Sequence, residues 1–96
     1  MAADPDVMLK QMQEDRQILQ CIRSQGTAWR VVWLEGRRRA TSIVASAPLC
    51  RLVEKKRANL DTLYEPGSEQ QLLAMRDWAS LAWLLWVVEE AEAAEG

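Results

Sequence analysis

The sequence of 96 residues predicts a small α+β domain whose elements follow the order helix, β-hairpin, helix, helix. Apolar residues recur at helical spacing before residue 26 and again after residue 45. The stretch between them alternates with a period of two and is rich in Val and Trp. A chain of this length is expected to form one domain, residues 1–96. If residues 28–47 were helical instead, the fold would be all-α, which is the alternative.

Residues 6–25 are expected to form the first helix. Its apolar stripe, at spacings close to 3.5 residues, consists of Met8, Met12, Leu19 and Ile22. Asp4 or Asp6 can cap the start, Pro5 suits a first turn, and Gly26 is a reasonable stop. The pattern favours a single amphipathic helix lying on a small sheet, although the stripe is also suited to a helix pair.

Residues 28–47 are expected to form a β-hairpin. The alternating residues of its first strand are Trp29, Val31 and Trp33. Glu35-Gly36 is a turn signal, and residues 41–45 form a second, weaker strand. Arg37, Arg38 and Arg39 then lie at or just past the tip of the hairpin.

Two further helices are expected at 46–64 and 68–93. Ser46 can cap the first, which ends where proline and glycine follow each other. Ser68 and Gln71 have the spacing of a capping box at the start of the second. We expect fraying at both ends of the chain, over residues 1–5 and 90–96. In the second of these, acidic residues stand at a helix C-terminus, where the helix dipole disfavours negative charge.

The most informative segment is the apolar run 78–88, which has almost no polar side and holds three of the five Trp residues. A helix that is apolar all round must be covered on most of its faces, and a chain this small has little material with which to cover it. The run is therefore either a buried core helix or part of an interface. A homodimer is the expected assembly, with the seam formed by Trp78, Trp83 and Trp86.

The composition argues against catalysis. The chain has no His, which removes the usual general base and the commonest metal ligand. Its two cysteines, Cys21 and Cys50, cannot build a four-ligand zinc site within one chain. We expect both to be reduced thiols, with a Cys21–Cys50 bridge as the alternative. No catalytic residue, metal, cofactor or small-molecule substrate is predicted, and the protein is not expected to be an enzyme.

Charge is strongly segregated behind a net charge of −2. Residues 36–57 carry seven basic residues and one acidic residue, whereas residues 58–96 carry one basic and eight acidic residues. The two segments can face each other within the fold or across a dimer. Alternatively, the basic segment can bind a nucleic acid or an acidic protein surface. The first explanation is favoured, because nucleic-acid-binding domains are usually basic overall.

The sequence thus predicts a non-enzymatic accessory or regulatory protein, an adapter or inhibitor, that acts by binding a larger protein. The alternative is a nucleic-acid-binding protein that uses the basic segment 37–57. The residues expected to bind a partner or nucleic acid are Trp29, Trp33, Arg37, Arg38, Arg39, Lys55, Lys56 and Arg57. The chain has no apolar segment long enough to span a membrane and no signal peptide at residues 1–6. A cytoplasmic location, or the cytosol or nucleus of a host cell, is expected.

Overall fold

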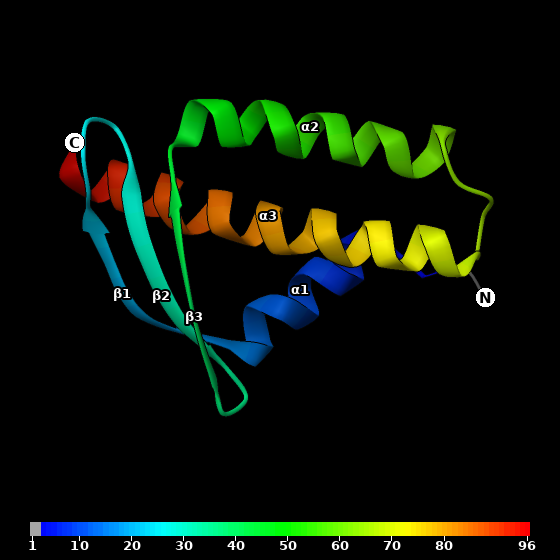
Figure 1. Cartoon of the computed structure of the whole chain (residues 1–96), viewed down its shortest axis with the longest axis horizontal. Coiled ribbons are helices and arrows are strands. Elements are labelled where there is room, and N and C mark those ends of the chain that lie inside the picture. Colours follow the sequence, from blue (N-terminus) through cyan, green and yellow to red (C-terminus); the bar gives the residue numbers. More distant parts are fainter. Residues whose placement is uncertain (1–2) are drawn as a thin grey trace.

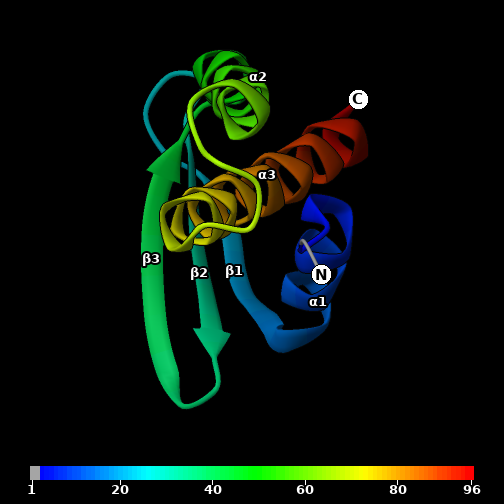
Figure 2. The ribbon, with the colours of Figure 1, turned by 90° about the vertical axis from the view of Figure 1, so that its right-hand side faces the viewer.

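A computed structural model describes residues 3–96 as three strands and three helices. In chain order these are α1 (Pro5–Asp15), β1 (Arg16–Arg23), β2 (Trp29–Glu35), β3 (Arg38–Val44), α2 (Ser46–Thr62) and α3 (Glu69–Glu95). The strands form one antiparallel sheet in the order β1-β2-β3. The three helices lie on one side of this sheet, with α3 between α1 and α2 (Figures 1 and 2). The result is a small compact α+β domain.

The predicted hairpin is confirmed as β2 and β3, and the all-α alternative is wrong. Glu35 pairs with Arg38, which leaves Gly36 and Arg37 as a two-residue turn. Gly36 has a φ of 63°. Hairpin turns of this length need a positive φ at their first position, which glycine adopts without steric cost.

The prediction of one helix over 6–25 is wrong in its second half. The start is as expected, because Asp4 is the N-cap and accepts a hydrogen bond from the amide of Asp6. The helix ends at Asp15, and Arg16 already has extended backbone angles of −103° and 136°. Residues 16–23 form an edge strand, and Gly26, with a φ of 60°, belongs to the turn that leads into β2. Pairing with β2 therefore overrides the helical spacing of Leu19 and Ile22.

The last two helices match the prediction closely. Ser68 caps α3 by accepting a hydrogen bond from the amide of Gln71, as expected. The Gln71 side chain, however, accepts from the amide of Gly67 at 2.7 Å and donates to the carbonyl of Leu60 at 3.1 Å, so it joins the end of α2 to the start of α3. The cap expected from Ser46 is wrong: Ala45 is the N-cap of α2 and makes no side-chain bond.

At the C-terminus, α3 runs through Glu95, and the carboxylate of Glu95 forms a two-point ion pair with Arg23 of β1 at 2.8 and 3.2 Å. This ion pair joins the end of α3 to the sheet, while the fraying that we expected at 90–96 stays a prediction. At the other end, the fraying expected for residues 1–5 falls partly on residues 1–2, which lie outside the described residues.

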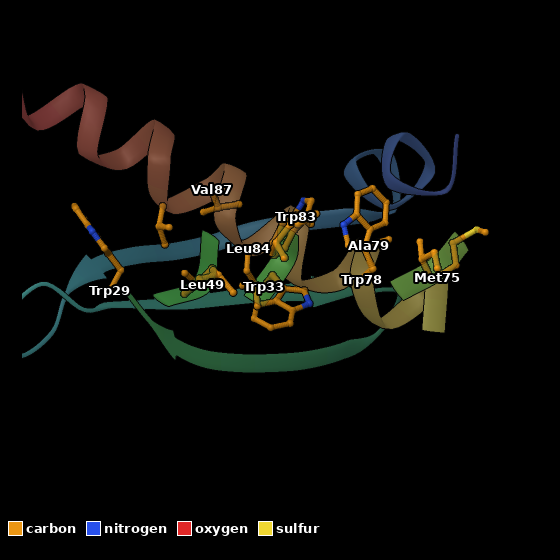
Figure 3. Packing of buried hydrophobic residues seen from close by; sticks show 14 residues of the cluster. Trp29, Trp33, Leu49, Met75, Trp78, Ala79, Trp83, Leu84 and Val87 are labelled. Carbon is orange, nitrogen blue, oxygen red and sulfur yellow. The ribbon is translucent and has the colours of Figure 1, made fainter. Parts of the chain in front are cut away.

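Within one chain, α3 is covered by α2, α1 and the inner face of the sheet. Nine of its residues are buried, and they lie on every side of the helix: Gln71, Met75, Trp78, Ala79, Ala82, Trp83, Leu84, Val87 and Val88. From the sheet, Trp29, Val31 and Trp33 join the same core (Figure 3). The ring centroids of Trp33 and Trp83 are 5.3 Å apart and tilted by 60°. The core of a single chain therefore accounts for most of the apolar surface of this helix.

Candidate binding surface

The face of the sheet that points away from the helices is a regular surface that no helix covers (Figure 2). Residues paired directly across antiparallel strands share a face, so the pairing defines three rows on this face. These rows are Gln17-Leu34-Arg39, Gln20-Val32-Thr41 and Ile22-Arg30-Ile43. None of the nine belongs to the hydrophobic core cluster. We call these nine residues the open sheet face.

The open sheet face combines apolar side chains with positive charge. Val32, in its centre, is only 3% exposed although no helix covers it, because its neighbours on the sheet surround it. Ile43 is 62% exposed at one edge. Arg30 and Arg39 are exposed, and no carboxylate stands among the nine residues. Such a surface favours a partner with a matching apolar patch and negative charge.

The structure divides the three-arginine run between two sides of the sheet. Arg37 lies in the turn, and Arg39 lies on the open sheet face opposite Leu34. Arg38 pairs with Glu35 and so shares the helix-facing side with that carboxylate. Only Arg37 and Arg39 can therefore act together with Arg30 on one surface.

The second basic cluster, on α2, is largely engaged inside the protein. Lys56 donates to Asp77 of α3 at 2.6 Å. Arg57 is 3.6 Å from Asp61, and its guanidinium lies 5.5 Å from the ring centre of Trp78. Of the three, Lys55 is the exposed residue. Part of the charge segregation thus reflects pairing within the fold, as the favoured explanation expected, whereas no ion pair among residues 3–96 involves Arg37, Arg38 or Arg39.

Trp29 and Trp33, which we expected to contact a partner, are buried in the core and offer no ring face for stacking on a base. The guanidinium of Arg23 packs 4.4 Å from the ring centre of Trp29. Periodicity indicated correctly that the two Trp residues share one face of a strand, but that face is the one under the helices.

Sequence reasoning missed the role of Arg16. Its side chain is only 6% exposed, and its guanidinium packs beside the rings of both Trp33 and Trp83, at 5.0 and 4.8 Å from their centres. Its Nε donates to Glu35 at 2.8 Å and its Nη2 to the hydroxyl of Ser80 at 2.9 Å. This buried cation ties β1 to β2 and α3. The only sequence signal was a lone Arg directly after Asp15, which is not distinctive.

The three Trp residues expected at a subunit seam differ in how exposed they are. Trp78 and Trp83 are buried within the chain, at 6% and 1% exposed. Trp86 is 42% exposed and is the member of the three that a partner could contact directly. The structure thus weakens the reason for expecting a second copy at this seam, since α3 finds its cover in its own chain.

Both cysteines are free, and neither is activated. Burial raises the pKa of the Cys21 thiol. The hydrogen bond that the Cys50 thiol donates to Glu54 raises the pKa of this thiol, and burial is the second cause of the same shift. A raised pKa reduces the thiolate that nucleophilic or redox chemistry requires. Among residues 3–96, no three His, Cys, Asp or Glu side chains converge as metal ligands, and no helix is long and apolar enough to cross a membrane.

Comparison with family models, with curated proteins and with solved structures found no match to this chain. The functional proposal therefore rests on the surfaces of the molecule itself.

Proposed function

We propose that the protein is a non-enzymatic accessory or regulatory protein that binds a larger protein through its open sheet face. The observation that carries the proposal is the composition of this face: a continuous antiparallel surface with exposed isoleucines, two guanidinium groups and no carboxylate. Charge of one sign speeds encounter with an oppositely charged partner, and the exposed side chains of Ile22 and Ile43 then provide apolar area to bury. The partner surface that fits is acidic with an apolar patch.

A protein partner is favoured over nucleic acid for two reasons. The open sheet face has apolar residues at Ile22, Leu34 and Ile43, but no aromatic ring on which a base could stack. The basic groups of the segment 37–57 are also distributed over the turn, two sides of the sheet and α2, so they do not form one track along a phosphate backbone.

The test is an affinity capture from host lysate with and without nuclease, using the wild type and two variants. Arg30→Glu combined with Arg39→Glu reverses the charge of the open sheet face. Lys10→Glu reverses an exposed charge on α1 and is the matched control. We expect a stoichiometric protein that survives nuclease, is retained by Lys10→Glu and is lost with the double variant. Its affinity for the wild type should fall with added salt.

Equal capture by the double variant would place binding on another surface and refute the proposal. Recovery of nucleic acid alone would favour the alternative. In that case the affinity for duplex DNA should fall with salt with a slope near −0.9 per phosphate contact. Replacing Arg37, Arg38 and Arg39 by Ala should then remove up to about three contacts from that slope.

A further inference from the structure

Residues of α1 and of the first half of α3 line a groove of about 940 Å³. The helix α1 lies on the other side of α3 from α2 (Figure 2). The apolar lining of the groove includes Val7, Met8, Met12 and Leu73. Val7 and Leu73 are largely exposed, although they stand on neighbouring helices. Methionine side chains adapt to irregular partners, and grooves between helices commonly take an amphipathic helix.

The charge around the groove is mainly negative. Four carboxylates line it, namely those of Asp4, Asp15, Glu35 and Asp77, against the guanidiniums of Arg16 and Arg76. Arg16 is engaged by Glu35, and Asp77 by Lys56. Among the described residues, this leaves Asp4 and Asp15 on the α1 side and Arg76 on the α3 side without an ion pair, so the α1 wall of the groove is complementary to a helix that carries positive charge beside apolar residues.

The chain itself carries such a helix. The outward side of α2 exposes Leu52 and, at the C-cap just past the end of the helix, Leu63. These two residues are eleven apart and so lie on one side of the helix, about three turns from each other. Arg51 and Lys55 are exposed on the same half of the helix. The distance between the leucines along the axis is about 16 Å at 1.5 Å per residue, close to the length of the eleven-residue α1 that forms one wall of the groove.

We propose that the protein self-associates by laying the outward side of α2 of one copy into the α1–α3 groove of a second copy. The α2 helix of the same chain cannot fill its own groove, because α3 stands between them (Figures 1 and 2). Because α2 and the groove lie on opposite sides of α3, the contact is head-to-tail: α2 of one copy occupies the groove of the next, so that a dimer keeps one free α2 and one free groove. The inference is independent of the open sheet face, which such an assembly leaves uncovered.

The test uses two charge reversals that leave the core untouched. Lys55→Glu alters the outward side of α2, and Asp15→Lys alters the groove. The second change also places a positive charge at the C-terminal end of α1, where the helix dipole favours it. We expect the wild type to dimerise in a concentration-dependent way by sedimentation equilibrium, and each variant alone to associate at least tenfold more weakly.

Mixing the two variants is the decisive measurement. The Lys55→Glu chain keeps an intact groove, and the Asp15→Lys chain keeps an intact α2. An equimolar mixture should therefore regain the contact between the intact groove and the intact α2 and associate more tightly than either variant alone. The double variant Arg30→Glu with Arg39→Glu, which tests the proposed function, should self-associate like the wild type, so that failure of this inference and failure of the proposed function can be told apart.

Three outcomes would overturn the inference. A wild type that is monomeric up to about 1 mM has no self-contact of useful strength. Association that is unchanged in both variants would locate the contact elsewhere. Variants that both lose association but do not recover it in the mixture would exclude the exchange of α2 for the groove.

Discussion

The clearest test of how α3 is buried is to truncate two of its Trp residues separately. Trp83 is 1% exposed and packs on Trp33 and Arg16, whereas Trp86, one turn away, is 42% exposed. If one chain covers the helix as the structure shows, Trp83→Ala must destabilise the fold far more than Trp86→Ala. If α3 is instead covered by a second copy along the seam that the sequence suggested, the two costs should be similar.

The expected difference follows from the exposed fractions. A tryptophan side chain can bury up to about 250 Å², so the difference between 1% and 42% corresponds to about 100 Å². At about 25 cal/mol per Å² this gives about 2.5 kcal/mol, before the cavity left at Trp83 is counted. We therefore expect a cost of about 3–5 kcal/mol for Trp83→Ala and about 1–2 kcal/mol for Trp86→Ala. For a domain of this size, the difference corresponds to melting temperatures roughly 10–20 °C apart.

Urea unfolding followed by far-UV circular dichroism measures both free energies, at two protein concentrations tenfold apart. Trp83→Phe, which keeps an aromatic ring in the core, is the milder variant to use if Trp83→Ala does not fold. A cost for Trp86→Ala that equals or exceeds that of Trp83→Ala would refute this account of the core. So would a midpoint that depends on concentration for the wild type and Trp83→Ala but not for Trp86→Ala, because truncating the exposed Trp would then have removed an interface contact.

The Arg16 site offers a second, independent measurement on the same core. A double-mutant cycle between Arg16→Met and Trp83→Phe should give a coupling energy of about 0.5–2 kcal/mol, since the guanidinium packs against the indole away from water. Arg16→Met keeps an unbranched apolar stem but removes the charged guanidinium. A coupling energy near zero would mean that Arg16 only fills space beside the ring.

Three further predictions concern the ends of the helices and the thiols. Gln71→Ala should lower the free energy of unfolding by about 1–3 kcal/mol, measured by urea titration, because it leaves buried backbone groups unpaired. The hydrogen-bonded ion pair with Arg23 lowers the pKa of Glu95. The contribution of this pair to stability is therefore present above the ordinary pKa of a glutamate and is lost as the pH falls through the lower pKa of the folded state. The difference in the free energy of unfolding between the wild type and Glu95→Gln should shrink as the pH falls through this lower value. Finally, Glu54→Gln should lower the pKa of Cys50 and speed its alkylation by iodoacetamide near neutral pH, whereas an unchanged rate profile would contradict the hydrogen bond.

The second half of the chain could be predicted because its local signals agree with its tertiary environment. Ser68 has the right spacing and serves as the cap, and proline and glycine interrupt the chain between α2 and α3 as expected. The hairpin is another example, since a period-2 pattern and a glycine at the turn indicate the same structure that the sheet adopts.

Strand β1 could not be predicted, because its apolar and polar residues do not alternate with a period of two. Apolar residues occupy both parities, with Ile18 and Ile22 on one and Leu19 and Cys21 on the other. The pairing register also shifts between Ile18 and Gln20, so that alternation is broken in the middle of the strand. The helical spacing of Met8, Met12, Leu19 and Ile22 is then a stronger signal in the sequence than the strand pattern, because the strand is stabilised by its pairing with residues 29–35.

The candidate surface was only partly predictable for a related reason. Arg37 and Arg39 were identified from charge alone, but a residue's side of the sheet depends on register, and the sequence does not fix that register. Arg30, which stands in the strand between two core-facing residues, gave no separate signal until the pairing placed it between Ile22 and Ile43.

The charge segregation has a specific consequence once the fold is known. The contacts that neutralise the basic segment are those of α2, where Lys56 meets Asp77 and Arg57 meets Asp61. The basic residues of the open sheet face differ from those of α2. Among residues 3–96, neither Arg30 nor Arg39 lies in an ion pair, although the chain as a whole carries more acidic than basic residues. Charges left unpaired on a surface that also exposes isoleucines repel a second copy of the same surface. The open sheet face is therefore unsuited to pairing with itself, and a different, acidic molecule is the partner that its chemistry fits.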